Sequence, residues 1–433
     1  MTIACNNKST LKEVQTIVND LKAEYAPDKR VALWDIQIDQ GGQKIQLTGQ
    51  TNLLEAKADL LKELTKKGID YEDKIKIFPT KILADKTYGI VNVSVCNIRS
   101  KNGHSQELAT QSLLGTPIKV LDQKENWFLV QTPDKYIAWL DHGGFVQVNE
   151  ITYKEWISTP KVMYTSNFGF SYETPNLAAQ KITDLVAGNI LKSIGKEKGF
   201  IKVQYPDGRK GYIPATEVIN YDTWLASRTP NAANILATAQ EYLGRPYLWG
   251  GTSGKGMDCS GFTKTVFYLN GVQLARDASQ QVHTGNSIET DETLKNIVPG
   301  DLLFFGRKAT SEKKERITHV GIYMGKGEFI HSSGDAGVKV RQGVRDALVA
   351  IEKDSIKNKQ TQNKTPITLV SQSLGSKVLR DALVCEDDTN QKASNKSFIN
   401  QVDRNVQYLS DTQQVFLVSN QIALLNRGNS GQC

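Results

Sequence analysis

Long apolar runs are scarce in this chain of 433 residues, and none approaches the length of about 20 residues that a membrane-spanning helix needs. The N-terminus lacks the basic region and apolar core of a complete signal peptide. A basic stripe is also lacking, because 53 Lys and Arg residues are mixed with 46 Asp and Glu residues. The net charge of +7 therefore does not predict nucleic-acid binding. With 39% hydrophobic and 23% charged residues, the composition is typical of a folded protein.

Cysteine is scarce and scattered, at positions 5, 96, 259, 385 and 433. The number is odd and no Cys-x-x-Cys pair occurs, which argues against a disulfide framework and a zinc ribbon. Thr2–Cys5, followed by polar residues, resembles the end of a bacterial lipoprotein cleavage site, and an ordinary surface cysteine is the alternative. This start favours the cell envelope or periplasm, as a lipoprotein with a truncated signal. The alternative location is the cytoplasm.

Residues 1–80 combine helical and strand patterns. Apolar residues follow helical spacing over Leu11–Leu21 and Leu53–Leu64. Between them, Leu33–Ile38 and Ile45–Leu47 alternate as strands around a Gly-Gly turn. This helix–strand–strand–helix order resembles the small BON-like domains of bacterial envelope proteins, which implies an accessory structural or binding role.

The next part of the chain changes to short strands and turns, and it contains an internal repeat. Val130–Asp134 recurs further along as Val203–Asp207, and Tyr136-Ile137 recurs as Tyr212-Ile213 at a slightly longer offset. A repeat of this kind predicts one structural unit present twice, with coincidence in turn-rich sequence as the alternative. The pattern resembles tandem bacterial SH3-like barrels, over residues 86–155 and 156–222.

Cys259 is the candidate nucleophile. An apolar helical face runs over Phe262–Leu269 and stops at Asn270-Gly271, so Asp258 is expected to cap a helix with Cys259 in its first turn. The positive end of the helix dipole and the free N–H groups there are expected to lower the pKa of the thiol. The alternative is a buried cysteine that packs as a small hydrophobic residue.

Two of the five histidines lie on a predicted hairpin. Ile317–Met324 and Glu328–Ser332 read as strands around the turn at residues 325–327. Folding there sets His319 opposite His331 or one of its next two neighbours, so the two imidazoles become cross-strand neighbours. A capped cysteine and two histidines make a nucleophile, a base and an orienting group.

Five motifs, in this order, resemble those of one family. They are Tyr247–Gly251, Asp258–Phe262, Pro299–Leu302, His319–Tyr323 and Ile330–Ser333. Together they are similar to the NlpC-type cysteine endopeptidases of bacterial cell-wall metabolism, which have a papain-like α+β fold. Upstream SH3-like barrels are similar to a branch that cuts the γ-D-glutamyl to diamino-acid bond of peptidoglycan stem peptides.

The resemblance implies roles for the catalytic residues. Cys259 matches the nucleophile, and His319 matches the general base that later acts as an acid. His331 matches the polar group that holds the imidazole of His319. The hydroxyl of Tyr247 matches a donor to the oxyanion, beside the backbone N–H of Cys259.

The resemblance also implies residues that bind the substrate. That branch accepts peptides with a free N-terminal L-alanine, and the positions that match its ammonium-binding groups are Asp258, Glu107 and Tyr136. Peptide binding is matched by Ser260 and Ser279. For Glu107 a solvated surface residue is the alternative, and for Asp258 a helix cap fits either interpretation.

Residues 342–433 depart from this family. Thr365–Val370 is predicted as a strand, Ser371–Gly375 as a sharp turn and Ser376–Val384 as a helix. The order resembles the nucleophile elbow of α/β-hydrolases, with Ser373 in the nucleophile position. This stretch contains no histidine to serve as a base, so we expect an inactive α/β-hydrolase-like fragment.

The sequence predicts a multidomain α+β protein with an αββα domain, two SH3-like barrels, a papain-like catalytic domain over residues 230–341 and the partial α/β segment. The predicted function is hydrolysis of the γ-D-glutamyl to diamino-acid bond of peptidoglycan stem peptides with a free N-terminal L-Ala. A catalytically impaired cell-wall-binding protein is the alternative. No cofactor or metal is expected, because the paired histidines have no carboxylate at ligand spacing. The oligomeric state is not predicted.

Overall fold

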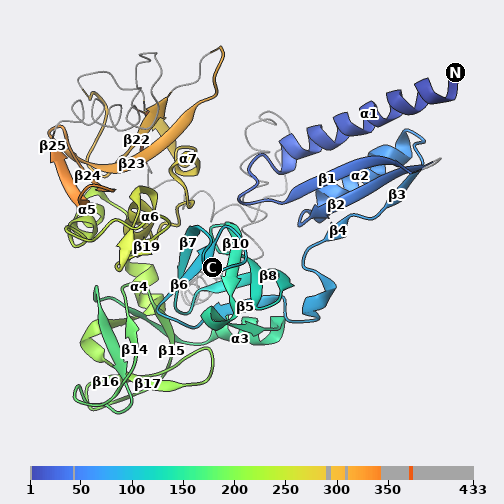
Figure 1. The fold of residues 1–433 in the computed structure, drawn as a ribbon. Coiled ribbons are helices and arrows are strands. Elements are labelled where there is room, and N and C mark those ends of the chain that lie inside the picture. The colour runs from blue at the N-terminus through green and yellow to red at the C-terminus, as the bar shows by residue number, and fades with distance from the viewer. Residues whose placement is uncertain (1, 42–43, 289–293, 308–310, 343–369, 374–433) are drawn as a thin grey trace, which may run out of the picture. The chain divides into compact units, whose positions relative to one another are not determined.

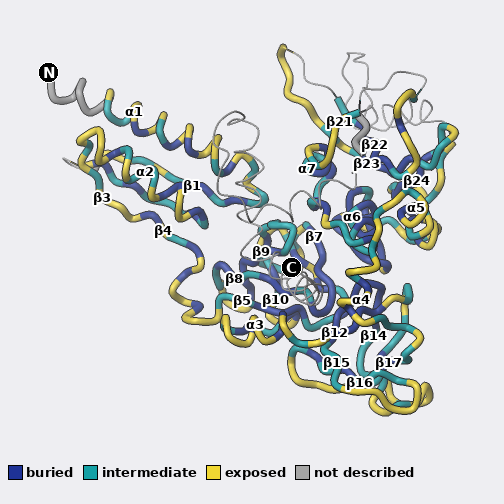
Figure 2. Tube along the Cα trace, turned by 180° about the vertical axis from the view of Figure 1, so that it is seen from behind, coloured by how far each residue is buried: buried dark blue, intermediate teal, exposed yellow. Residues whose placement is uncertain are grey.

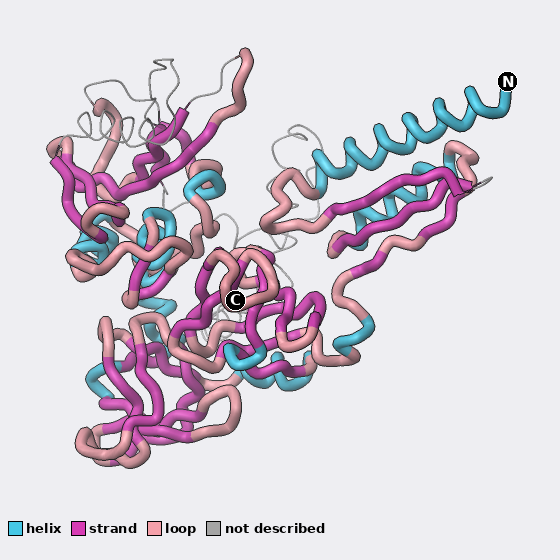
Figure 3. The backbone as a smooth tube through the Cα atoms, in the orientation of Figure 1, coloured by secondary structure: helices cyan, strands magenta, loops and turns pink. Residues whose placement is uncertain are grey.

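The computed structural model describes residues 2–41, 44–288, 294–307, 311–342 and 370–373 (Figure 1). They form two compact units, one made of Met1–Ile90, Ile98–Glu107 and Pro117–Tyr153, the other of Val91–Asn97, Leu108–Thr116 and the chain from Lys154 onward. Both barrels are built mainly of strands, and helices are concentrated at the N-terminus and beside the sheet that carries the histidines (Figure 3). The predicted α+β class is confirmed.

The first unit begins with a small domain of helices on a sheet. Its elements are α1 (Thr2–Tyr25), β1 (Trp34–Gly41), β2 (Lys44–Thr51), α2 (Leu54–Lys66), β3 (Tyr71–Asp73) and β4 (Lys76–Ile77). β1 and β2 are antiparallel, whereas β3 and β4 pair parallel to β2. Val14 and Val18 of α1 and Leu60 of α2 are at most 2% exposed, as their helical spacing predicts. The sequence pattern does not predict β3 and β4, since strands this short carry no alternation.

Two seven-stranded barrels follow. Barrel 1 contains η1 (Lys81–Leu83), β5 (Tyr88–Val91), β6 (Val95–Arg99), β7 (Leu108–Leu113), β8 (Pro117–Lys124), β9 (Trp127–Gln131), β10 (Ile137–Asp141), η2 (His142–Gly144), β11 (Phe145–Val148) and α3 (Glu150–Ser158). Barrel 2 contains β12 (Lys161–Tyr164), β13 (Gly169–Tyr172), β14 (Lys181–Leu185), β15 (Ile190–Glu197), β16 (Phe200–Gln204), β17 (Lys210–Pro214), η3 (Ala215–Glu217), β18 (Val218–Asn220) and α4 (Tyr221–Ser227).

The two barrels have the same strand order. Barrel 1 runs β11-β5-β8-β9-β10-β6-β7 and barrel 2 runs β18-β12-β15-β16-β17-β13-β14. Their registers agree as well, because Trp139 opposes Arg99 in barrel 1 and Tyr212 opposes Tyr172 in barrel 2. The offset from Trp139 to Tyr212 equals the offset from Arg99 to Tyr172. Residues of the two barrels that are related by this common offset are therefore structurally equivalent.

The sequence repeat maps onto one pair of equivalent hairpins. Val130–Asp134 includes the end of β9, and Val203–Asp207 includes the end of β16. The two segments are related by the common offset, so they are structurally equivalent. The second match is wrong as an equivalence. Ile137 opposes the last residue of β9, whereas Ile213 opposes the second residue of β16. The structural equivalent of a residue in the hairpin of barrel 1 is always found at the common offset. Tyr212-Ile213 lies at a longer offset and is therefore not the equivalent of Tyr136-Ile137.

The cysteine and histidine motifs lie in the second unit. Its remaining elements are α5 (Ala232–Gln240), β19 (Thr252–Ser253), β20 (Gly256–Met257), α6 (Cys259–Leu269), α7 (Ala278–Gln281), β21 (Asn286–Ile288), β22 (Leu302–Arg307), β23 (Arg316–Gly325), β24 (Glu328–Ser333), β25 (Gly337–Gln342) and β26 (Val370–Ser373). β19 and β20 form a small hairpin, and the other strands form an antiparallel sheet in the order β21-β26-β22-β23-β24-β25. α6 is largely buried, and its Phe262 and Val266 pack in one core with Val320 and Ile322 of β23 (Figure 2).

β26 corrects the prediction for the tail of the chain. Its residues form an antiparallel strand between β21 and β22, with Ser371 opposite Leu303 and Ser373 opposite Asn286. A nucleophile elbow needs a sharp turn from strand to helix, so the predicted turn is wrong over residues 371–373. The predicted strand residues 365–369 and the predicted helix lie outside the described residues.

Candidate active site

α6 begins where the sequence pattern predicts it. The carboxylate of Asp258 accepts a hydrogen bond from the backbone N–H of Gly261, with an N–O distance of 2.7 Å, and so caps the helix that starts at Cys259. The helix ends at Leu269, and Gly271 follows with φ of 83°, a backbone conformation typical of the residue after a helix. Both helix signals are confirmed.

The thiol of Cys259 is packed against the core of its unit. Burial, together with the neighbouring Asp258 carboxylate, raises the pKa of the Cys259 thiol to about 12. Hydrogen bonds from the backbone N–H groups of Val320 and Ser260 lower the pKa, but burial outweighs them. The expectation of a lowered thiol pKa is therefore wrong for this structure, and the thiol is neutral at pH 7.

β23 and β24 bring the two histidines together. Nε2 of His319 and Nδ1 of His331 are 2.7 Å apart, and the ring planes are nearly perpendicular. Burial lowers the pKa of His319 to about 4 and that of His331 to about 3, so both rings are neutral at pH 7. The predicted hairpin is confirmed, with Ile322 opposite Ile330.

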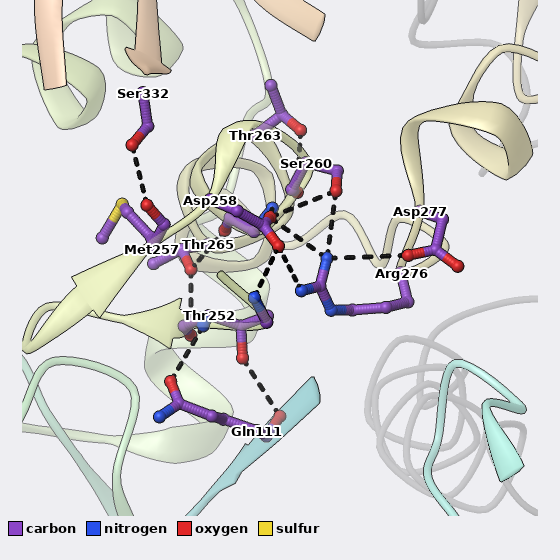
Figure 4. A network of polar contacts seen from close by, with 12 residues as sticks. Gln111, Thr252, Met257, Asp258, Ser260, Thr263, Thr265, Arg276, Asp277 and Ser332 are labelled. Atoms are coloured by element: carbon purple, nitrogen blue, oxygen red, sulfur yellow. Dashed lines mark hydrogen bonds and ion pairs between the residues drawn. The ribbon is translucent and has the colours of Figure 1, made fainter. Parts of the chain in front are cut away.

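Both histidine strands are tied to the start of α6. One of the two hydrogen bonds that Cys259 accepts comes from the backbone N–H of Val320, the residue after His319. Ser332, the residue after His331, donates from Oγ to the carbonyl of Met257 at 2.7 Å (Figure 4). The structure thus brings together the elements that carry all three predicted catalytic residues.

A buried ion pair holds the carboxylate of Asp258. Its partners are Nη1 and Nη2 of Arg276 at 3.2 and 2.6 Å, the Oγ of Ser260 at 3.2 Å and the backbone N–H groups of Gly250 and Gly261 (Figure 4). The Arg276 side chain is only 1% exposed. The carboxylate caps and anchors the helix, and the predicted role of Asp258 in binding a substrate ammonium stays a prediction.

Ser260 and Ser279, the predicted peptide-binding serines, lie on α6 and α7. The hydroxyl of Ser260 accepts a hydrogen bond from Nη1 of Arg276 at 3.0 Å, so it belongs to the same buried network. Gln281 joins the two helices, because its Nε2 donates to the carbonyl of Ser260 at 3.0 Å and its Oε1 accepts from Oγ1 of Thr263 at 2.7 Å. Peptide binding by the two serines stays a prediction.

Tyr247 lies beside the cysteine. It forms an isolated backbone bridge with Met257, two residues before Cys259. Burial raises the pKa of the Tyr247 hydroxyl above its usual range, and the charges of Cys259 and Asp258 add to the rise. The hydroxyl is therefore protonated at pH 7 and can donate a hydrogen bond, as an oxyanion-binding group must.

Glu107 and Tyr136 are the other predicted ammonium-binding residues, and both belong to the first unit. Glu107 comes directly before β7, and its carbonyl accepts from the N–H of Ser100. Tyr136 comes directly before β10, and its carbonyl accepts from the N–H of Thr132. Their predicted role in binding substrate stays a prediction.

The hairpin of β19 and β20 contacts equivalent positions of the two barrels. In β7, Oε1 of Gln111 accepts from the N–H of Thr252 at 2.9 Å, and the carbonyl of Gln111 accepts from Oγ1 of Thr252 at 3.0 Å (Figure 4). In β14, Asp184 is equivalent to Gln111 and pairs with Lys255 at 2.5 Å. The carbonyl of Thr252 accepts from Oγ1 of Thr265 in α6 at 3.1 Å, which links the hairpin to the cysteine helix.

Two absences concern the described part of the chain. No group of three or more His, Cys, Asp or Glu residues in it is arranged to hold a metal ion. No helix in it is long and apolar enough to cross a membrane.

Sequence reasoning missed Arg276, Gln281 and Gln111. For Arg276, which stands between Ala275 and Asp277, the sequence carries no local signal of burial. No local pattern identifies Gln111, which lies 141 residues from its partner Thr252. Gln281 is likewise recognised only once α6 and α7 are packed.

Comparisons with known proteins agree with this arrangement. Residues 244–361 match the NlpC/P60 family, residues 98–144 the bacterial dipeptidyl-peptidase Sh3 domain and residues 172–219 the bacterial SH3 domain. The gamma-D-glutamyl-L-lysine dipeptidyl-peptidase of Bacillus cereus is 30% identical over 243 residues, which cover 53% of this chain and 68% of that protein. The chain belongs to the NlpC/P60 family. An NlpC/P60 domain preceded by two bacterial SH3 domains, the predicted resemblance, is thereby confirmed.

Other relatives of this NlpC/P60 protein agree. The gamma-D-glutamyl-L-lysine dipeptidyl-peptidase of Bacillus subtilis is 32% identical over 228 residues, which cover 52% of this chain and 72% of that protein. A crystal structure of an NlpC/P60 family protein from Bacillus cereus matches 60% of this chain and 96% of its own, with a TM-score of 0.53 at 23% identity. That likeness supports the papain-like α+β fold. The family is one of peptidases, so this chain is an NlpC/P60 peptidase by descent.

Proposed function

We propose that this NlpC/P60 protein is a cysteine peptidase that hydrolyses the γ-D-glutamyl to diamino-acid bond of peptidoglycan stem peptides with a free N-terminal L-alanine. The observation that carries the proposal is the position of Cys259, at the start of a capped helix and bonded to the strand of His319. Nε2 of His319 in turn lies 2.7 Å from Nδ1 of His331. The names of the two Bacillus relatives support the choice of bond. The cell envelope is the proposed location because it holds this substrate, and cytoplasmic recycling is the alternative.

Proton transfer starts from a neutral pair. Burial keeps the thiol of Cys259 protonated and His319 unprotonated at pH 7. Because Nε2 of His319 bonds to Nδ1 of His331, the lone pair that accepts the thiol proton is on Nδ1 of His319, and Nε2 carries the proton. His331 accepts that Nε2–H and so fixes the tautomer. His319 then removes the thiol proton as the sulfur attacks.

The remaining steps use the same groups. The sulfur of Cys259 bonds to the amide carbonyl carbon, the C–N bond breaks, and the amine leaves with the proton held by His319. Water then attacks the thioester with His319 as the base, which releases the acid and restores the thiol. The backbone N–H of Cys259 and the hydroxyl of Tyr247 are the proposed donors to the oxyanion. Asp258, Glu107 and Tyr136 are the proposed groups for the ammonium of L-alanine.

The first test is release of diaminopimelate from L-Ala-γ-D-Glu-diaminopimelate. The Cys259→Ala variant is expected to lose at least about 10⁴-fold in rate, because the nucleophile is gone. Cys96→Ala is the matched control, since Cys96 is a second cysteine that is buried, in β6. Equal cleavage by the Cys259 variant contradicts the mechanism. No cleavage by folded wild-type protein that still binds wall fragments favours the cell-wall-binding alternative.

The second test is the pH profile of kcat/KM. His319 must be unprotonated to act as the base, and burial lowers its pKa to about 4. The rate is therefore expected to stay level from about pH 5 to about pH 9 and to fall about tenfold per unit below pH 4. The neutral thiol predicts no rise in rate over the alkaline part of this range. An acid limb near pH 6.5, the ordinary pKa of histidine, contradicts the buried neutral pair.

A further inference from the structure

Arg276 holds the residues on either side of the nucleophile. It lies in the segment between α6 and α7, and its Nη1 and Nη2 donate to the carboxylate of Asp258 at 3.2 and 2.6 Å (Figure 4). Nη1 also donates to Oγ of Ser260 at 3.0 Å. Asp258 comes directly before Cys259, and Ser260 directly after it. One planar guanidinium therefore fixes the chain on both sides of the thiol, which the point charge of a lysine does less well.

The backbone beside Arg276 is itself anchored to the cysteine helix. The carbonyl of Ala275 accepts from Nε2 of Gln281 at 2.9 Å, and the same Nε2 donates to the carbonyl of Ser260 at 3.0 Å. Gln281 thus ties the residue before Arg276 to the first turn of α6. Because the Arg276 side chain is also buried, water and salt screen its charge little.

A helix cap beside a nucleophile does not need a charge. Asparagine caps a helix about as well as aspartate does, because its amide oxygen accepts the same N–H. A buried ion pair adds little to stability, since the desolvation of the two charges offsets their attraction. The side chains of Asp258 and Arg276 are only 9% and 1% exposed. Capping alone therefore does not explain why this position holds a charged pair.

The two charges act on the thiol of Cys259 in opposite directions. The carboxylate of Asp258 raises the pKa of the thiol, because it repels the negative charge of a thiolate. The guanidinium of Arg276 lowers the same pKa. When the sulfur gives up its proton and attacks, negative charge develops beside the carboxylate, and the guanidinium offsets the repulsion.

Three other titratable groups lie around the thiol, and all are uncharged at pH 7. Tyr247 precedes β19, His319 lies on β23 and His331 lies on β24. Burial raises the pKa of Tyr247, lowers that of His319 to about 4 and lowers that of His331 to about 3. The charged groups beyond the histidines act on the two rings, and they are Asp335, Lys339 and Arg341. The charge balance at the thiol itself therefore depends on Asp258 and Arg276.

We propose that Arg276 is a positioning residue for the nucleophile. It fixes Asp258 and Ser260 on both sides of Cys259, and it balances the capping carboxylate so that negative charge can develop on the sulfur. The proposal rests on the proposed function only in taking Cys259 as the nucleophile. An ion pair that serves stability alone is the alternative, and it predicts that the reactivity of the thiol does not follow the sign of the neighbouring charge.

The test measures alkylation of Cys259, which is partly exposed, by iodoacetamide in the full chain, with mass spectrometry of the modified peptide. The thiolate sulfur bonds to the reagent carbon and iodide leaves, so the rate follows the thiolate fraction. Arg276→Gln is expected to react at least about tenfold more slowly at each pH, because the carboxylate then opposes the thiolate without a countercharge. Asp258→Asn is expected to react at least about tenfold faster, because the guanidinium is then uncompensated.

Charge rescue separates electrostatics from stability. The Asp258→Asn/Arg276→Gln variant removes both charges and keeps an amide cap, so it is expected to react within about threefold of the wild-type rate. Arg276→Lys keeps the charge but not the planar two-point contact, and an intermediate rate is expected.

Two controls accompany these variants. Arg228→Gln is the matched control, because Nη1 of Arg228 donates to the carbonyl of Leu269 at 3.5 Å, at the other end of α6. It is expected to react as the wild type does. Cys96 is the internal control, since it is 4% exposed and is alkylated only where the fold opens.

Each outcome decides the proposal. An unchanged rate in the Arg276→Gln variant, or a double variant as slow as that single variant, overturns it when Cys96 stays protected. If Arg276→Gln exposes Cys96, the Asp258→Asn variant and the double variant decide, since they differ only at residue 276. Equal rates in those two overturn the proposal.

The result is independent of the scissile bond, because iodoacetamide is not a peptide. A protein that shows the expected order of rates but cleaves no stem peptide refutes the proposed function alone. A protein that cleaves stem peptides but does not show that order of rates refutes the role of Arg276 alone.

Discussion

Barrel 1 and barrel 2 use one equivalent position alike and one equivalent face differently. Gln111 and Asp184 occupy the same place in β7 and β14, and both reach the hairpin of β19 and β20. By contrast, Trp139 packs under the N-terminal part of the first unit, whereas its equivalent Tyr212 lies on a face bordered by lysines. Both barrels keep the same strand order, because that order depends on residues that point inward. The residues that point outward can differ in their contacts.

The largest effect is expected at the equivalent residues Trp139 and Tyr212. Trp139→Ala removes a partly buried ring that packs on the apolar cluster of Phe78 and Leu129, so it is expected to cost about 2 kcal/mol of unfolding free energy. Tyr212→Ala changes a partly exposed ring and is expected to cost about 1 kcal/mol or less. Hydrogen exchange of the amides in β9–β10 and β16–β17 measures the two local stabilities separately. Equal losses contradict this difference between Trp139 and Tyr212.

A smaller effect is expected at the equivalent residues Gln111 and Asp184, which both contact the hairpin of β19 and β20. Gln111→Ala leaves the buried N–H of Thr252 without its acceptor, which is expected to cost about 1–3 kcal/mol and to lower kcat/KM. Asp184→Ala breaks an ion pair whose lysine is 41% exposed and a hydrogen bond from Oγ of Ser94 at 3.0 Å, so its expected cost is about 1 kcal/mol.

The control for Gln111 is Asn97→Ala. Asn97 accepts from Nε2 of Gln111 at 2.9 Å, so this change leaves both bonds to Thr252 intact. Stem-peptide hydrolysis together with hydrogen exchange at the Thr252 amide measures the effect. If the Asp184 variant loses as much kcat/KM as the Gln111 variant, Gln111 does not contribute more than Asp184 to holding the hairpin.

Local signals in the sequence predict much of this molecule. The capped start of α6 at Cys259 and the hairpin of His319 and His331 follow from spacing and turn residues over a few positions. The repeat at Val130 and Val203 locates the paired barrels, because equivalent hairpins keep the same turn residues. Such features depend on interactions between residues that are close in the chain.

Features that depend on packing are not visible in the sequence. The helix dipole predicts a lowered pKa for Cys259, but the burial that raises it depends on the sheet behind α6. The sequence shows a carboxylate at Asp258, but its buried ion pair with Arg276 is visible only in the structure. The strand β26 is missed for the same reason, since its partners lie far back in the chain.

The shared strand order also creates a risk while the chain folds, because neighbouring copies of one architecture can exchange strands and misassemble. Different inward residues oppose such an exchange. Barrel 2 pairs a small Ser171 with a large Tyr205, whose hydroxyl groups are hydrogen-bonded, whereas the equivalent positions of barrel 1 hold Ile98 and Thr132. An exchanged strand would crowd Ile98 against Tyr205 in one hybrid and leave a void between Ser171 and Thr132 in the other. The different buried pairs therefore disfavour hybrid barrels on packing grounds.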